Sequence, residues 1–177
     1  MVLPLFRKSA AAEHVHALYG AIVAQSRQPR FYADWGVPDT VTGRFDMISL
    51  HMALVFRRLR AESAATRDFS QALFDLFFKD MDRSLREMGA SDIAVPKKIK
   101  TMTTLFYGLA AHLDEALQKQ DAAAVEAVLL RNIYGADAGA GAASAALARY
   151  VIAEGNALAE HSVNDLLLGR LAAGAAA

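Results

Sequence analysis

Apolar side chains recur at helical spacing along most of this chain, and no stretch alternates between apolar and polar residues as a half-buried strand would. The clearest case is the segment 45–62, in which two apolar rows each follow a period of three to four residues. A helix that is apolar on two faces belongs at the centre of a bundle. The pattern therefore predicts an all-α fold: a single-domain, irregular helical bundle of about six helices.

Capping residues and breaks place these helices along the chain. The expected segments are about 11–25, 45–62, from after Asp68 to Gly89, from near Pro96 along a stripe ending at Leu113, from Asp121 to Gly135, and from about 143 towards Gly169. Gly89 suits a helix end, Pro96 a first turn and Asp121 an N-cap. The single domain spans 1–177, with 1–10 and 170–177 expected to fray and a flexible break expected near 135–143.

Charge and composition exclude several classes of function. Nineteen basic and nineteen acidic side chains cancel, so no net positive field is available for a nucleic-acid backbone. The chain has no cysteine, which excludes disulfides, thiolate metal sites and thiol catalysis. The longest uncharged apolar runs, such as 101–113, fall short of the roughly 20 residues that a bilayer requires. We expect a soluble, cytoplasmic protein, with a peripheral place at the inner membrane left open.

The segment from Tyr19 to Phe45 carries more aromatic, proline and glycine residues than a plain helix connection needs. In one interpretation its aromatic residues fill the gap between the first two helices. In the other they form a partly exposed groove with an arginine rim, which could hold an apolar segment of a partner. Both can hold at once, with Phe31 and Tyr32 buried and Trp35 nearer the rim. The candidate partner-binding residues are Arg27, Phe31, Tyr32, Trp35 and Arg44.

Polar residues around this segment have structural interpretations. Asp80 and Asp82 are two positions apart and diverge on a helix, so they do not form an acid–base pair. We expect one of them to pair with Arg44 and tie the third helix to the loop. Either Asp39 or Thr40 can cap the next helix. The residues assigned to the loop and its ion pairs are Asp39, Thr40, Gly43, Asp80, Asp82 and Arg86.

No constellation for catalysis, metal or cofactor binding stands out. Glu13-x-x-His16 is the sole motif of its kind, whereas a di-metal helical bundle needs two. His51 lies on an apolar helix and is interpreted as a hydrogen-bonded core residue, with haem ligation as the alternative. The glycine-rich stretch 135–144 lacks the Lys-Ser/Thr of a phosphate loop. The sequence therefore predicts no catalytic residue, no metal, no cofactor and no enzyme.

Several segments together carry a resemblance to a known family. The strings Y-G-A-I-V-A-Q-S-R-Q-P-R-F-Y and G-V-P-D-T-V-T-G-R-F-D resemble the ubiquinol–cytochrome c chaperone family. Further matching pieces follow in the family's order: Leu50-His51, Lys79-Asp80-Met81-Asp82, Leu85-Arg86-Glu87-Met88-Gly89, Asp92, Val95-Pro96-Lys97 and Tyr107-Gly108. The resemblance covers roughly 15–135 and, more loosely, the chain up to Gly169.

The resemblance implies a non-catalytic assembly chaperone for the cytochrome bc1 complex, which holds cytochrome b, a segment of it or another bc1 subunit before assembly. A second assembly factor is left open as a further partner. Two other classes stay open: a helical enzyme or binding protein for a quinone-like or isoprenoid-like ligand, and a scaffold that associates with itself.

Overall fold

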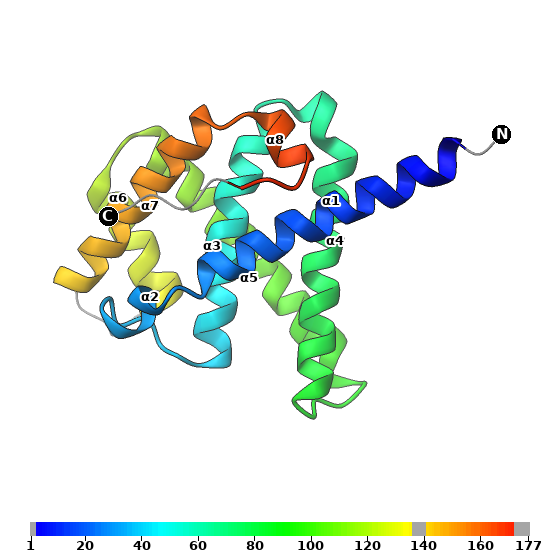
Figure 1. The fold of residues 1–177 in the computed structure, drawn as a ribbon. Coiled ribbons are helices and arrows are strands. Elements are labelled where there is room, and N and C mark those ends of the chain that lie inside the picture. Colours follow the sequence, from blue (N-terminus) through cyan, green and yellow to red (C-terminus); the bar gives the residue numbers. More distant parts are fainter. Residues whose placement is uncertain (1–2, 136–140, 172–177) are drawn as a thin grey trace.

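A computed structural model describes residues 3–135 and 141–171 of this chain. Within these ranges the structure is all-helical and has no strand, which confirms the predicted fold class (Figure 1). The elements in chain order are α1 (Leu3–Ser26), α2 (Pro29–Ala33), α3 (Val41–Arg60), α4 (Ser63–Glu87), α5 (Ala94–Gln118), α6 (Ala122–Leu129), the π-helical segment η1 (Leu130–Tyr134), α7 (Ala142–Glu160) and α8 (Val163–Leu167).

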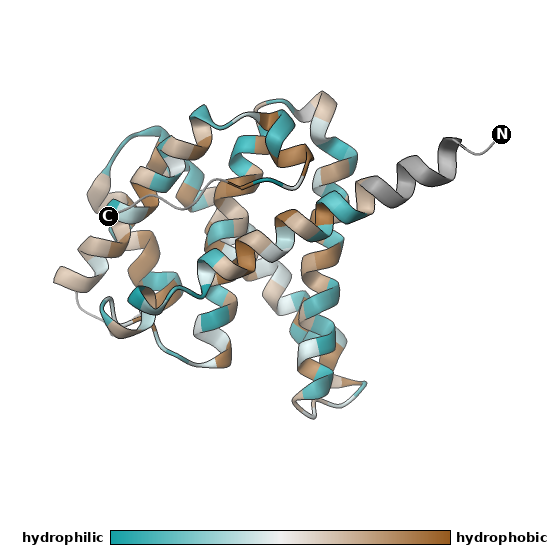
Figure 2. Ribbon diagram, in the orientation of Figure 1, coloured by the Kyte–Doolittle hydropathy of each residue, from teal (hydrophilic) through white to brown (hydrophobic). Residues whose placement is uncertain are grey.

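Helix α3 is the central helix, as its two apolar faces predicted. It contacts α1, α4, α5, α7 and η1, and 12 of its residues are buried. Hydrophobic and hydrophilic residues interleave along the long helices around it (Figure 2). This is the pattern expected of amphipathic helices that pack on one another and expose their other face to water.

Phenylalanine side chains join α3, α4 and α5. The rings of Phe45 and Phe77 stack with centroids 5.7 Å apart and planes at 6°. Phe77 also lies 5.8 Å from Phe106, in an edge-to-face arrangement. Such ring pairs add to the stability gained from burial alone. One continuous aromatic core therefore holds these three helices together.

The helix ends confirm three of the capping predictions. The Thr40 hydroxyl accepts a hydrogen bond from the Gly43 amide at 3.1 Å, so Thr40 rather than Asp39 caps α3. Gly89 has φ +87° just after α4, the left-handed conformation common at helix ends. The Asp121 carboxylate accepts from the Ala124 amide at 3.0 Å and caps α6.

Other predicted bounds were wrong or lie outside the described residues. α1 begins at Leu3 rather than near 11, and the short helix α2 was not predicted. The last predicted helix is two helices, because the backbone turns extended at His161 and Ser162 caps α8. The break expected near 135–143 and the fraying expected of 170–177 fall largely outside the described residues.

Helix α8 ends against α1. Gly169, with φ +77°, follows α8, and a Cβ atom placed on it would lie 2.7 Å from the His14 carbonyl oxygen. The end of the described chain therefore packs directly on the first helix, and this close approach requires glycine.

Candidate functional site

The predicted aromatic cluster lies on α2 and just after it. Phe31 is fully buried, and its ring lies 5.1 Å from Tyr150 of α7 and 5.5 Å from His51 of α3. Trp35 is partly buried, 5.5 Å from Phe31 and 5.8 Å from Tyr150. Phe31 and Trp35 thus pack the loop onto the core, as the first interpretation held, but against α3 and α7 rather than between the first two predicted helices.

A buried polar network lies beneath these rings. The His51 Nδ1 donates to the Met47 carbonyl oxygen at 2.8 Å, and its Nε2 accepts from the Tyr150 hydroxyl at 2.8 Å. Burial lowers the pKa of His51, which favours the neutral ring that this pattern requires. Both ring nitrogens are therefore engaged. The interpretation of His51 as a hydrogen-bonded core residue is confirmed, and neither of its ring nitrogens is free to bind haem iron.

The same network connects distant parts of the chain. The Gln25 side-chain amide donates to the Tyr150 hydroxyl at 3.0 Å and to the Glu154 carboxylate at 2.8 Å. The Arg30 guanidinium lies over the rings of Phe31 and Tyr150, 5.4 and 4.9 Å from their centroids. Buried polar groups that are hydrogen-bonded in this way specify one arrangement of α1, α2 and α7.

A hollow of about 380 Å³ opens beside α2, and we call it the α2 hollow. It is lined by Arg27, Pro29, Tyr32, Ala33, Asp39 and Arg44. Three of the five candidate partner-binding residues, Arg27, Tyr32 and Arg44, therefore meet around one space. Phe31 and Trp35 do not line it; they support it from the core side.

The ion pair predicted for Arg44 is wrong. Arg44, in the first turn of α3, pairs at 2.7 Å with Asp39, five residues earlier in the loop before that helix, rather than with Asp80 or Asp82. The Arg44 guanidinium holds the pKa of the Asp39 carboxyl below its usual range. Both side chains are exposed, so the pair adds little to stability.

The two α4 carboxylates have other partners. Asp80 accepts hydrogen bonds from the Tyr19 hydroxyl at 2.8 Å and from Arg83 at 2.7 Å, so it ties α4 to α1. Asp82 pairs with Arg86 at 2.6 Å, one helical turn away. Arg86 also pairs with Asp92 across the turn between α4 and α5. Both carboxylates thus have partners on α4 itself, and Asp80 has a further one on α1; neither pairs with Arg44.

Gly43 is required where the loop enters α3. A Cβ atom on Gly43 would lie 2.0 Å from the Pro38 carbonyl oxygen, which is a backbone atom and cannot move aside freely. Gly43→Ala is expected to lower the free energy of unfolding by about 1–3 kcal/mol, in the range of other overpacking substitutions. Urea unfolding monitored by circular dichroism measures this loss.

Gly20 provides the matched control for Gly43. It lies within α1, and a Cβ atom there would meet nothing within 4 Å. Gly20→Ala is expected to raise the free energy of unfolding by up to about 1 kcal/mol, since alanine favours a helix more than glycine does. If both variants change the free energy of unfolding in the same direction, the close contact with Pro38 is not the reason that glycine is needed at position 43.

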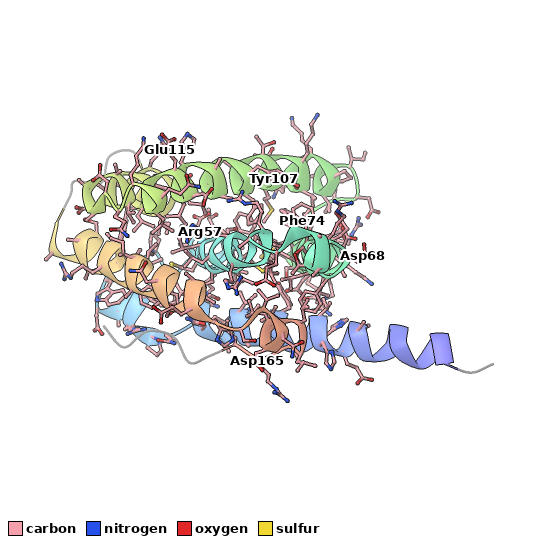
Figure 3. The ribbon with its side chains drawn as sticks, turned by 90° about the horizontal axis from the view of Figure 1, so that it is seen from above. Arg57, Asp68, Phe74, Tyr107, Glu115 and Asp165 are labelled. Carbon is pink, nitrogen blue, oxygen red and sulfur yellow. The ribbon has the colours of Figure 1, made fainter. Side chains whose placement is uncertain are left out.

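A second hollow, of about 370 Å³, opens between α3, α4 and α5, and we call it the α3–α4–α5 groove. It is lined by Ala53, Leu54, Phe56, Arg57, Arg60, Thr66, Arg67, Ser70, Gln71, Phe74, Phe106, Tyr107, Ala110, Leu113 and Asp114. Arg57 on α3, Phe74 on α4 and Tyr107 on α5 show the three helices that contribute to it (Figure 3).

The floor of this groove is aromatic. Phe56 and Phe74 each lie 6.0 Å from Phe106 in edge-to-face arrangements. Tyr107 stacks on Phe74 at 5.7 Å and is 58% exposed. Phe56 and Phe74 are partly exposed, so the aromatic core of the bundle reaches the surface here. Such a surface can bury apolar area of a ligand or partner.

Three charged side chains of the groove are engaged with one another. Arg57 and Arg60 both donate to the Asp114 carboxylate, at 2.9 and 2.6 Å. The Gln118 amide donates to the same carboxylate at 2.9 Å. Among the described residues that line the groove, Asp114 is the one carboxylate, and two guanidinium groups hold it in place. The described lining therefore brings together no acid–base or nucleophile pair, and its chemistry is that of apolar binding.

Sequence reasoning did not identify this groove. Phe56, Phe74 and Phe106 recur at helical spacing with other apolar residues of their helices, which favours positions facing the core, and Tyr107 belonged only to the resemblance. The signal that was present lies in α3: a helix apolar on two faces that also carries Arg57 and Arg60 at a helical spacing. Other helices pack on both apolar faces of such a helix, and the arginines lie on the polar strip between those faces.

Two further observations concern the described residues alone. In 3–135 and 141–171, no three His, Asp or Glu side chains gather as a metal site would need. In the same ranges, no helix is both long and apolar enough to cross a membrane.

The fold and the groove together define an all-helical bundle whose surface hollows suit binding. A sequence profile of the ubiquinol-cytochrome C chaperone family matches residues 33–173. The fold is similar to the crystal structure of the Cbp3 homolog from Brucella abortus, with a TM-score of 0.84 and 43% identity over 96% of this chain and 94% of that one.

A curated relative is more distant. The chain is 22% identical over 116 residues to ubiquinol-cytochrome-c reductase complex assembly factor 1 of Xenopus laevis, which is 66% of this chain and 58% of that protein. The chain thus spans less than two thirds of that relative's length. These findings confirm the resemblance: the chain belongs to the ubiquinol-cytochrome c chaperone family.

Proposed function

We propose that this protein is a holding chaperone for assembly of the cytochrome bc1 complex, with cytochrome b or a segment of it as the client. Membership of the chaperone family supports this role, as does the name of the Xenopus relative. The structural observation that carries the proposal is the α3–α4–α5 groove, whose partly exposed aromatic floor packs on the hydrophobic core.

The mode of action we propose is shielding without turnover. A subunit that crosses a membrane exposes apolar helices until its partners arrive, and exposed apolar surface leads to aggregation. A groove of about 370 Å³ accepts a few large side chains from one face of such a helix, in the manner of helix-in-groove recognition. Partner subunits that bind the client more tightly would then release it by competition.

The α2 hollow is the second contact in this proposal. Arg27, Tyr32 and Arg44 would touch the client or a second assembly factor there, while Phe31 and Trp35 hold the loop in shape. The exposed guanidinium groups suit acidic or carbonyl-rich segments of a partner. We place the protein on the cytoplasmic side of the inner membrane, where a membrane-bound client is made and assembled.

Recovery of cytochrome b with a tagged groove variant tests whether the α3–α4–α5 groove binds the client. Tyr107→Glu places a charge on the aromatic floor at a side chain that is 58% exposed, so the fold should tolerate it. We expect at least about a tenfold loss of cytochrome b recovered with the tagged protein from respiring cells, because a charge in an apolar contact must be desolvated. Immunoblotting for cytochrome b measures the recovery.

Val41→Glu is the matched control, because Val41 is also 58% exposed and lies at the start of α3 outside the groove. It should leave recovery unchanged. Equal recovery with both variants would remove the groove from the proposal. A gain in melting temperature with quinones but no capture of cytochrome b would favour the small-ligand alternative.

A further inference from the structure

The stretch from Ile93 to Leu113 contains no acidic residue, although acids and bases balance over the whole chain. Lys97, Lys98 and Lys100 lie in this stretch and make up half of all the lysines in the sequence. All three are exposed, and in the described part of the chain no ion pair neutralises them. The first turns of α5 thus present positive charge with no acid of their own helix beside it.

Large apolar side chains are exposed around these lysines. Ile93, just before α5, is 91% exposed, and Leu105, three turns into α5, is 54% exposed. Met88, at the end of α4, is 50% exposed. One exposed apolar side chain is ordinary. Three of them around a lysine cluster, on one turn and the helix that follows it, form a combined apolar and basic surface.

Helical spacing places part of this set on one side of α5. Lys98 and Leu105 are seven residues apart, which is two turns, and Lys97 and Thr101 lie on the adjoining strip. We call the set Met88, Ile93, Lys97, Lys98 and Leu105 the α5 surface. Lys100 is two positions from Lys98 and diverges from it on the helix, so it is left out of the set.

The position of the α5 surface leaves it open to a flat partner. The turn between α4 and α5 projects from the rest of the bundle at the lower end of the view (Figure 1). Seen from above, α5 lies along one side of the molecule and α1 along the opposite side (Figure 3). A plane can therefore touch α5 without meeting α1.

We propose that the α5 surface docks onto the anionic lipid face of a membrane. Lysines near a negatively charged leaflet are attracted to its headgroups, and exposed apolar side chains beside them enter the headgroup region. This deepens the membrane location in the proposed function and rests on it for its biological meaning, while its test needs no client.

Other occupants fit the α5 surface less well. A nucleic-acid backbone would use the lysines but leave Ile93 and Leu105 in water, since phosphate contacts are electrostatic. A second copy of the chain in a two-fold dimer would bring the two lysine clusters together. Like charges placed so close oppose that contact. An anionic bilayer matches both the charge and the apolar side chains.

Co-sedimentation with vesicles tests the proposal on the full chain. We expect binding to phosphatidylcholine vesicles that contain about one third phosphatidylglycerol, weak binding to pure phosphatidylcholine, and weaker binding at high ionic strength. The double variant Lys97→Gln, Lys98→Gln should reduce partitioning onto anionic vesicles by about fivefold for each lysine. Arg131→Gln with Arg149→Gln removes the same charge from exposed positions on η1 and α7 and should change nothing.

The apolar side chains of the α5 surface are expected to contribute to vesicle binding in a way that does not depend on salt. Ile93→Asn and Leu105→Asn should each lower partitioning several-fold at both low and high ionic strength, because apolar burial is not screened by salt. Both side chains are mainly exposed, so melting temperatures should stay unchanged and show that the fold is intact.

Three results would overturn the proposal. One is wild-type protein that does not sediment with anionic vesicles at low ionic strength. Another is equal loss of binding in the lysine pair and the arginine pair, which would mean that net charge alone acts. The third is a dimer in solution that Leu105→Asn dissociates, which would assign the α5 surface to contact between copies. Recovery of cytochrome b with the Tyr107→Glu variant is measured in a separate experiment. The proposed client binding and the proposed membrane docking can therefore fail independently.

Discussion

Phe31→Ala is expected to lower the free energy of unfolding by about 3–5 kcal/mol, the usual cost of removing a fully buried aromatic side chain. Phe31 is 0% exposed and contacts Tyr150, His51 and Trp35 through its ring. The substitution would leave a cavity above the buried polar network and release α2 from the core. Equilibrium unfolding in urea, followed by the fluorescence of the single tryptophan, measures both effects.

Tyr32→Ala is the comparison for Phe31. Tyr32 is the next residue but is only partly buried, and its hydroxyl donates to the Ser26 carbonyl oxygen at 3.0 Å. Its loss should cost clearly less than the loss of Phe31. If Phe31→Ala kept wild-type stability but lost client capture, Phe31 would be a binding residue and the packing described for α2 would be wrong.

Asp46→Asn is expected to stabilise the protein, and to do so more as the pH rises. Asp46 lies in α3 and is partly buried, and burial raises the pKa of its carboxyl to about 7. Below about pH 4 the carboxyl is protonated in both the folded and the unfolded state, so it affects stability little. Between about pH 4 and pH 7 the unfolded chain gives up this proton while the folded protein keeps it, so stability falls across that window.

At about pH 8 the folded protein carries the full cost of a partly buried charge, and Asp46→Asn should recover about 2–4 kcal/mol. Unfolding in urea at about pH 4 and at about pH 8 tests this, and the gain should be near zero at the lower value. Asp68→Asn removes a carboxylate from an exposed position and serves as the control. A gain that is the same at both pH values would show that ionisation of Asp46 does not cause it.

The helices could be predicted because their apolar rows are long. The segment 45–62 shows two rows over several turns, and α3 occupies nearly the same range with burial on most sides. Thr40 and Asp121 were predictable as caps because their side chains act on amides three residues away. By contrast, α2 has five residues and one buried side chain, too few for any period to show.

The candidate site could be predicted only where its residues lie close together in the sequence. The segment 27–44 contains both the aromatic cluster and the residues of the α2 hollow, so its unusual composition pointed to the right place. The partner of Arg44 was mispredicted, because the choice between Asp39 and a carboxylate on α4 depends on distances that only the folded chain has. Client binding by Arg27, Tyr32 and Arg44 stays a prediction.

The α3–α4–α5 groove could not be derived from the sequence for a different reason. Phe56, Phe74 and Phe106 have the spacing of core residues; Phe106 lies in the core, and Phe56 and Phe74 pack against it while partly exposed. A groove forms where the packing of three helices ends before their aromatic side chains are covered. Periodicity reports which face of a helix is apolar, but it carries no information on how far the neighbouring helix extends over that face.

The contacts between Gln25 and α7, and between Gly169 and α1, bear on the order of folding. They join positions more than a hundred residues apart. During synthesis α1 emerges before α3 and α4, on which most of it packs, and its contacts with α7 and α8 form only when those last helices follow. Closure of the bundle must therefore wait for the last helices, and the loop entropy of such distant contacts makes it a slow step. Until then α1 is held by α3 and α4 alone, and the part of it that meets the last helices stays uncovered.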